Sequence, residues 1–355
     1  MMKKYLFLGA LLFCVALYSQ KPQEPTDFSS YNSEDVSFKN LKDGVTLTGT
    51  FTYPKNARKI PVVILISGSG PQDRNSALLG HKPFLVIADD LTRKGIGVLR
   101  VDDRGTGTSE GKYNDTSLDG FVNDTRSAIE YIKTRKEVDK SEIGLLGHSL
   151  GGIIAPIIAA ESKDVAFTVL LAGPGIRGDK LMLLQKASME RKMGLTEQVI
   201  ESNGKLMAGA WDMILNSDAD HIKLEAGLAT YFTNTFGSAL PQATVSSMSK
   251  QLSYPWLADM INFDPETALS KVNCPVLALN GINDTQVPSK ENLEAIKAAL
   301  QKAGNKDYTA LELPHLNHLF QESVTGLVQE YATIEQTFSP KALNIISDWI
   351  LLKTK

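Results

Sequence analysis

One serine stands in a sequence context that could make it a nucleophile. Ser149 lies on the G-x-S-x-G pattern of residues 147–151, within a segment (143–152) where a short apolar strand meets a helix of small residues. So tight a turn requires residues without side chains two positions before and after the serine, and Gly147 and Gly151 meet this requirement. The strained turn would lift the Ser149 hydroxyl above the edge of a sheet, with His148 held beside it. The pattern also occurs in ordinary strand-to-helix connections, so the rest of the chain must supply the other catalytic groups.

A serine hydroxyl attacks a carbonyl carbon effectively only when a base accepts its proton and an acid orients that base. Asp284 follows an expected apolar strand, and His315 and His318 both follow the last expected strand. We expect His318 to be the base because it lies further beyond its strand than His315. The sequence therefore predicts Ser149, His318 and Asp284 as nucleophile, base and orienting acid.

Other roles for these polar residues stay open. Asp284 could be a turn or helix-capping residue, in which case Asp179, after another strand, is the reserve acid. His315 and His318 also form an H-x-x-H pair, a spacing that can bind a metal ion. The chain offers no third ligand nearby and no H-E-x-x-H helix, so we expect no metal site.

The negative charge that develops during attack on a carbonyl needs backbone N–H donors. One donor should be Leu150, directly after the serine. The second should come from the loop Gly68-Ser69-Gly70-Pro71, where we expect the Ser69 N–H rather than that of Gly70. The same loop could cradle a phosphate, but it lacks the spacing of nucleotide-binding loops and its proline removes a donor. We therefore expect no cofactor.

The elements that must position these residues alternate between strand and helix. A hairpin of strands over residues 36–39 and 45–53 opens the domain. Further strands are expected over 61–66, 95–102, 143–146, 165–171, 274–280 and 308–313, and helices over 83–94, 118–136, 153–160, 292–302 and 340–352. This alternation predicts a doubly wound, mostly parallel α/β sheet, whose site forms at the carboxyl ends of the strands.

The alternation is interrupted by a long helical stretch. Residues 179–264 contain no good strand and are too many for a simple loop, so we expect an inserted helical lid. The seven methionines outside the initial pair all lie there, which predicts either an adaptable apolar surface over an acyl group or filling of the lid's own helix contacts. We divide the chain into a signal peptide (1–19), a leader with a hairpin (20–60), core (61–174), lid (175–264) and core again (265–355).

The first residues are typical of a secretory signal peptide. Lys3 and Lys4 precede an uncharged run over residues 5–18, and Ser19 offers a cleavage position. The run is shorter than the roughly 20 residues of a membrane span, so we expect export to the periplasm or outside without stable membrane insertion, although a retained anchor is the alternative. After its removal Cys274 is the single cysteine, which excludes an intramolecular disulfide. The polar residues 21–34 that follow are expected to form a flexible leader.

The composition is that of a soluble globular protein. The chain has 355 residues, of which 43% are hydrophobic and 22% charged, and its net charge is -3. These values allow one large core or two smaller ones. No cluster of basic and aromatic residues appears, which argues against binding of nucleic acid.

The motifs together resemble those of the α/β-hydrolase superfamily, and specifically of exported bacterial esterases grouped with serine-aminopeptidase-like hydrolases. The resemblance rests on G-H-S-L-G-G at residues 147–152 and on residues 67–74, 101–109, 279–284 and 316–320. It implies hydrolysis of carboxylic esters of small or medium acyl groups, with the triad in the chain order Ser149, Asp284, His318. One departure is Ser67-Gly68, where the family usually has His-Gly, and it bears on the second oxyanion donor.

Two other functions remain as alternatives. A peptidase that releases N-terminal residues would need lid carboxylates such as Glu190, Glu197 or Glu201 to bind the substrate's ammonium group. A non-catalytic binding protein could also be built on a hydrolase scaffold.

Three charged residues near the glycine-rich loops also need a role. We expect Asp103 and Arg104 to brace these loops as a charged pair rather than to react. Arg74 could bind a substrate carboxylate or pair with Asp73.

Overall fold

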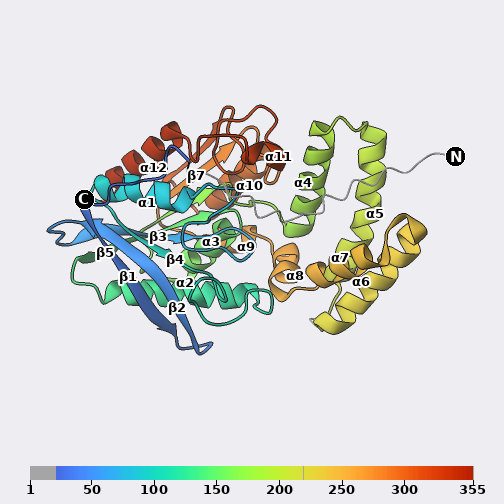
Figure 1. Ribbon diagram of the computed structural model, residues 1–355, viewed down its shortest axis with the longest axis horizontal. Coiled ribbons are helices and arrows are strands. Elements are labelled where there is room, and N and C mark those ends of the chain that lie inside the picture. Colours follow the sequence, from blue (N-terminus) through green and yellow to red (C-terminus); the bar gives the residue numbers. More distant parts are fainter. Residues whose placement is uncertain (1–20, 219, 355) are drawn as a thin grey trace.

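An eight-stranded sheet forms the centre of the protein in the computed structural model, which describes residues 21–218 and 220–354 (Figure 1). The strand order is β1-β2-β4-β3-β5-β6-β7-β8. The strands are β1 (Tyr31–Asn40), β2 (Val45–Pro54), β3 (Ile60–Ile66), β4 (Gly97–Val101), β5 (Val138–His148), β6 (Phe167–Leu171), β7 (Val276–Gly281) and β8 (Tyr308–Leu313). The predicted signal peptide lies outside the described residues.

The sheet is parallel except for its first two strands. β1 and β2 form the expected antiparallel hairpin, and β2 also pairs antiparallel with β4. All other neighbouring strands run parallel. The carboxyl ends of β5, β7 and β8 therefore lie at one edge of the sheet, where Ser149, Asp284 and His318 follow them.

Helices cover both faces of the sheet, which makes this an α/β-hydrolase fold. The core helices are α1 (Pro83–Arg93), α2 (Leu118–Lys133), α3 (Gly151–Glu161), α9 (Glu266–Leu269), α10 (Ser289–Lys302), α11 (Val328–Tyr331) and α12 (Pro340–Lys353). Along β3, Val62 and Ile64 pack with α2, α3 and α10, whereas Val63 and Leu65 pack with α1 and α12. This alternation explains why the strands are continuous apolar runs, since both of their faces are buried.

A helical insertion lies between β6 and β7, where no strand was expected. It consists of α4 (Gly178–Lys192), α5 (Glu197–Leu215), α6 (His221–Phe236), the short 3-10 helix Gly237–Ala239, α7 (Gln242–Leu252) and α8 (Pro255–Asn262). Figure 1 shows these helices beside the sheet rather than stacked on one of its faces. α8 joins them to the core, because the Asp259 carboxylate accepts a hydrogen bond from the Leu118 N–H at 3.0 Å.

The start of the described chain differs from the expected flexible leader. β1 begins at Tyr31, five residues before the apolar residues that indicated it. The side chains of Lys21 and Gln23 donate hydrogen bonds to backbone carbonyls of residues 332–338. The expectation of a flexible leader over 21–34 is therefore wrong at both ends: residues 31–34 belong to β1, and the side chains of Lys21 and Gln23 bond backbone groups more than 300 residues away.

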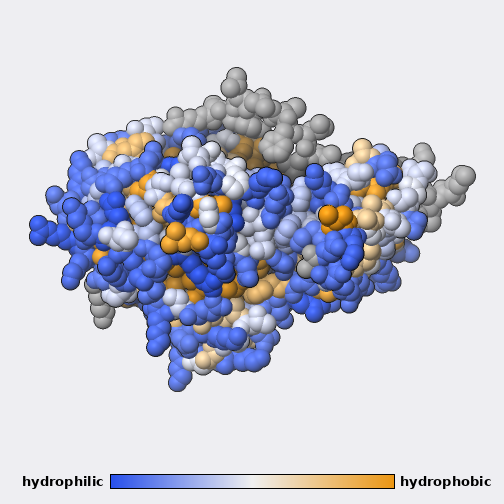
Figure 2. Space-filling model, turned by 90° about the horizontal axis from the view of Figure 1, so that it is seen from below, coloured by the Kyte–Doolittle hydropathy of each residue, from blue (hydrophilic) through white to orange (hydrophobic). Residues whose placement is uncertain are grey.

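One face of the molecule can be described by its hydropathy. Figure 2 shows one face on which hydrophilic residues surround smaller apolar patches. Within the described residues, no helix has both the length and the apolar character needed to cross a membrane.

Candidate active site

Ser149 lies on a strained turn between β5 and α3. Its φ is 52°, in the left-handed region that side chains other than glycine rarely adopt. A Cβ atom at Gly147 would overlap the carbonyl of Gly151, and one at Gly151 would overlap the carbonyl of Ile66. The Ser149 N–H donates to the Leu171 carbonyl at 2.9 Å, which ties the turn to β6. The glycines of the motif are thus required by close backbone approach.

His318 and Asp284 are hydrogen-bonded to each other. The distance from His318 Nδ1 to Asp284 Oδ2 is 2.8 Å, and both residues are buried. The other carboxylate oxygen of Asp284 accepts the N–H groups of Gln286 and Val287 at 2.8 and 2.9 Å. The carboxylate is therefore held from both sides, and it fixes the histidine with its proton on Nδ1 and its Nε2 free to accept a proton.

Ser149 and His318 line the same cavity, which has a volume of about 110 Å³. Its wall is built from the loop after β3, the start of α1 and the segment before α12. The apolar lining consists of Leu78, Pro83, Phe84, Ile87, Leu171, Leu319, Tyr331 and Phe338, and the polar lining of Ser69, Gln72, Ser76, His148 and Gln286. An apolar pocket with a few convergent polar groups at one end is typical of a small-molecule site.

The seven methionines of the helical insertion lie away from this cavity. Within the described residues, the insertion contributes no side chain to the wall around Ser149. Met182, Met207, Met213, Met248 and Met260 instead belong to the apolar cluster shared with the core. Packing between helices therefore accounts for most of them, and the role of the insertion as a lid stays a prediction.

His148 has a contact that the sequence did not reveal. Its Nε2 is 2.9 Å from the carbonyl oxygen of His318, and the two rings are 4.7 Å apart. Burial lowers the pKa of His148 to about 3. The neutral ring therefore donates from Nε2 and holds the backbone of the predicted base. A contact across 170 residues leaves no signal in local spacing.

The two backbone N–H groups predicted as oxyanion donors belong to Leu150 and Ser69. Within the described residues, neither the Leu150 N–H nor the Ser69 N–H has a hydrogen-bond partner. The Gly70 N–H instead donates to the Tyr113 hydroxyl at 2.9 Å. Gly70 is thus engaged, which favours Ser69, and the assignment of both donors stays a prediction.

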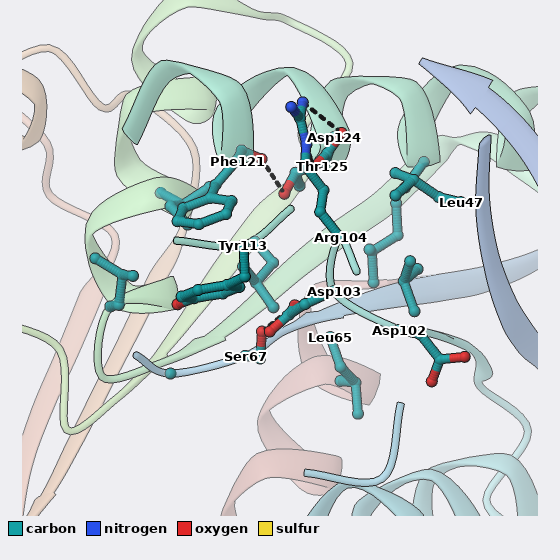
Figure 3. A pocket seen from close by; sticks show the side chains of 17 residues that line it. Leu47, Leu65, Ser67, Asp102, Asp103, Arg104, Tyr113, Phe121, Asp124 and Thr125 are labelled. Carbon is teal, nitrogen blue, oxygen red and sulfur yellow. Dashed lines mark hydrogen bonds and ion pairs between the residues drawn. The ribbon is translucent and has the colours of Figure 1, made fainter. Parts of the chain in front are cut away.

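Asp103 bonds the loop that carries Ser69, and Figure 3 shows its carboxylate beside Ser67. The Ser67 hydroxyl donates to one carboxylate oxygen of Asp103 at 2.7 Å, and the Gln72 N–H donates to the other at 2.9 Å. Burial raises the pKa of Asp103 to about 7, and the nearby charges of Asp124 and Asp102 act in the same direction. Ser67, which stands where the family usually has histidine, therefore serves to anchor the loop.

Arg104 forms structural contacts, as expected, but it does not pair with Asp103. It forms ion pairs with Asp43 and Asp124 and donates to the Gly120 carbonyl at 2.9 Å. Figure 3 shows its guanidinium turned toward Asp124. Asp103 and Arg104 therefore stabilise two different regions. The Asp103 side chain points toward Ser67, whereas the Arg104 side chain points toward Asp124 (Figure 3).

Arg74 does not pair with Asp73. Its guanidinium binds Asp102 at 2.6 Å and Asp35 at 2.8 Å. The Asp73 carboxylate instead accepts backbone N–H groups of its own turn. Because two carboxylates already occupy Arg74, it has no free face for a substrate carboxylate.

The carboxylates that the peptidase alternative would need for binding an ammonium group have partners within the helical insertion. Glu190 bonds Lys186 and Asn203, Glu197 bonds Arg191, and Glu201 bonds Lys205. None of the three lines the cavity at Ser149. Asp179, the reserve acid, pairs with Arg177 at 2.6 Å. The residues that a peptidase would need are therefore not gathered at this site.

The two histidines of the H-x-x-H pair have different surroundings. His318 is bound to Asp284, whereas His315 lies on a turn with a φ of 65°. Within the described residues, no group of three or more His, Cys, Asp or Glu side chains could hold a metal ion.

Comparison with known proteins gives the relatives of this chain. The family model described as serine aminopeptidase S33 matches residues 82–322, more than half of the chain. Esterase EstD of Thermotoga maritima is 27% identical over 301 residues, which cover 82% of this chain and 61% of EstD. This chain therefore spans about three fifths of the length of that relative.

Solved structures share the fold. The esterase Pf2001 of Pyrococcus furiosus is 17% identical with a TM-score of 0.53, covering 91% of this chain and 93% of its own. The hypothetical protein PA2218 of Pseudomonas aeruginosa is 18% identical with a TM-score of 0.57, covering 93% and 96%. Because the family model matches more than half of the chain, and the sheet has the α/β-hydrolase fold, the chain belongs to the serine aminopeptidase S33 family of α/β-hydrolases.

Proposed function

We propose that this protein is a serine hydrolase that cleaves carboxylic esters through an acyl-enzyme intermediate. The observation that carries the proposal is the buried hydrogen bond between His318 and Asp284 at the wall of a cavity that also contains the strained Ser149. A histidine that is oriented by a carboxylate and lines the same cavity as a serine hydroxyl is the arrangement that activates a nucleophile. The likeness to EstD supports an ester as substrate.

The proposed reaction has two steps, acylation of Ser149 and hydrolysis of the acyl-enzyme, and the same catalytic groups act in both. Ser149 Oγ attacks the ester carbonyl carbon while His318 Nε2 accepts its proton, and Asp284 stabilises the resulting imidazolium. The N–H groups of Leu150 and Ser69 hold the oxyanion. Collapse of the tetrahedral intermediate breaks the bond to the alcohol, which leaves with the proton from His318. A water molecule then releases the acid by the same steps.

The cavity supports small or medium acyl groups. Its volume is about 110 Å³, somewhat below the roughly 150 Å³ of an apolar cavity that accepts benzene. A group of about four to six heavy atoms therefore fits without movement of the wall. Aromatic and aliphatic side chains such as Phe84 and Leu171 line it, so an apolar group is favoured over a charged one.

Turnover of two substrate classes tests the proposal. We expect hydrolysis of p-nitrophenyl butyrate by the native protein and, for Ser149→Ala, a loss of about 10³-fold or more with an unchanged melting temperature. Aminoacyl p-nitroanilides should be poor substrates, because the three candidate carboxylates are paired elsewhere. Strong anilide cleavage with weak ester cleavage would favour the peptidase, and undiminished ester hydrolysis by Ser149→Ala would contradict the mechanism.

We also propose that the chain is exported to the periplasm or the outside. The basic residues Lys3 and Lys4, the apolar run after them and Ser19 support a cleavable signal. N-terminal sequencing of the protein from a fractionated bacterial host would test this. A first residue near position 20 is expected, and an intact first residue on a cytoplasmic protein would contradict export.

A further inference from the structure

The segment Lys21–Glu24, which we name the strap, binds the wall of the cavity. Lys21 Nζ donates to the carbonyls of Ala332 and Ile334 at 3.0 and 2.8 Å. At the far end of the strap, Glu24 forms an ion pair with Lys82, directly before α1. Figure 1 shows the blue start of the described chain beside the red C-terminal part.

Gln23 makes the densest contacts of the strap. Its side-chain Nε2 donates to the Phe338 carbonyl at 2.9 Å. Its Oε1 accepts the N–H groups of Thr337 and Phe338 at 2.6 and 2.9 Å. One amide side chain thus pairs with three backbone groups of an irregular segment that has no strand or helix partner for them.

The segment that the strap holds forms part of the cavity wall. Tyr331 and Phe338 line the cavity with Ser149, and both are buried. The Phe338 ring stacks on Phe320 at 5.3 Å with an angle of 15° between the rings. Phe320 lies two residues after His318, so this wall is continuous with the loop that carries the predicted base.

His81 holds the same segment from the side of α1. Its two ring nitrogens bond the Tyr331 carbonyl at 2.9 Å and the Thr337 hydroxyl at 3.0 Å. Burial lowers the pKa of His81, which keeps the ring neutral. Residues 331–338 are therefore fixed between His81 and the strap.

We propose that the strap determines substrate size by holding Tyr331 and Phe338 against the cavity. This inference rests on the proposed ester hydrolysis and adds that residues far from Ser149 in the sequence set its selectivity. With the strap bound, the cavity of about 110 Å³ favours short apolar groups. With the strap released, the wall can yield and longer groups fit. Gln23 is a positioning residue in this account, since it acts through the backbone of Phe338.

Three variants of the full chain test the proposal. Gln23→Ala removes all three hydrogen bonds, whereas Gln23→Glu keeps the oxygen that accepts the N–H groups of Thr337 and Phe338. Gln198→Ala, at an exposed position on α5, is the matched control. The readouts are the ratio of kcat/KM for p-nitrophenyl butyrate over the octanoate, and amide hydrogen exchange of residues 337 and 338.

We expect Gln23→Ala to lower the selectivity ratio by about fivefold or more and to speed exchange at residues 337 and 338 by about tenfold. Gln23→Glu should lie between Gln23→Ala and the native protein, and Gln198→Ala should match the native protein. Unchanged exchange in Gln23→Ala would overturn the proposal, as would faster exchange with an unchanged ratio. A native protein without Ser149-dependent ester turnover would instead overturn the proposed function, and exchange would still decide whether the strap holds the wall.

Discussion

The sheet and the helical insertion bury their residues to different extents. All five residues of β6 are buried, whereas α4, with 15 residues, buries only Gly178, Asp179 and Leu181. The catalytic residues we propose lie at strand ends of the sheet and are held by hydrogen bonds from several directions. Several charged residues of the insertion form local pairs, such as Arg191 with Glu197 and Lys205 with Glu201, and none lines the cavity at Ser149. The proposed chemistry thus lies where side chains are buried and hydrogen-bonded, which is the condition for keeping catalytic groups in position.

The largest difference in kcat between the two regions is expected when one aspartate of each region is replaced by asparagine. Asp284→Asn replaces the oxygen that accepts the His318 Nδ1–H by a group that can donate, so the histidine adopts the wrong tautomer. We expect kcat to fall by about 10⁴-fold. Asp179→Asn, at the start of the insertion, is the matched control and should keep kcat within about twofold. Steady-state kinetics on p-nitrophenyl butyrate measures both, and similar losses in the two variants would show that Asp284 is not the orienting acid.

A smaller effect is expected at the loop behind the oxyanion donors. Asp103→Asn leaves one acceptor oxygen for two donors, Ser67 and Gln72. One end of the loop should therefore shift, and we expect kcat to fall by about 10- to 100-fold with little change in KM. An unchanged kcat would show that the position of Ser69 does not depend on this carboxylate.

The same variant makes a prediction about stability and pH. The pKa of Asp103 is raised from 3.8 to about 7 in the folded protein, so the folded state binds this proton more tightly than the unfolded state. The contribution of Asp103 is therefore present below pH 4 and is lost as the pH rises through 7. Between pH 5 and 8, the native protein should lose about 2–3 kcal/mol of unfolding free energy relative to Asp103→Asn. Urea unfolding at both pH values measures this, and parallel pH dependences would contradict the assignment.

The smallest effect is expected within the insertion itself. In Glu190 one carboxylate oxygen accepts from Lys186 and Asn203, while the other is buried without a partner among the described residues. Glu190→Gln can keep the bonded oxygen, so kcat should stay within about twofold and stability within about 1 kcal/mol. A loss of activity of tenfold or more would indicate that this carboxylate contacts the substrate, and it would favour the peptidase alternative.

The fold could be predicted from the sequence wherever strands are buried on both faces. The apolar run at residues 61–66 marks β3 because no solvent-facing position interrupts it. β5 was expected to begin at Ile143 but begins at Val138. The sequence does not indicate this first part of the strand, because Asp139 and its polar neighbours lie outside the buried core and interrupt the apolar run. The helices of the insertion could be predicted because residues 179–264 lack strand patterns. Their position beside the sheet could not be predicted from the sequence.

The candidate site could be predicted only where its residues belong to local sequence patterns. The glycines around Ser149, and an acid and a base after later strands, are local patterns that sequence displays. The bond from His148 to the His318 carbonyl and the hold of Gln23 on Phe338 depend on residues 170 and 315 positions apart. Such contacts follow from the packing of loops and have no period or spacing in the sequence.

Covalent labelling with a fluorophosphonate, followed by intact-mass and peptide mass spectrometry, tests most directly whether Ser149 is activated by His318 and Asp284. The account predicts a single adduct on the peptide that contains Ser149, slow labelling in Asp284→Asn and no adduct in Ser149→Ala. A folded native protein that takes up no label, or that carries the adduct on another residue, would contradict the account.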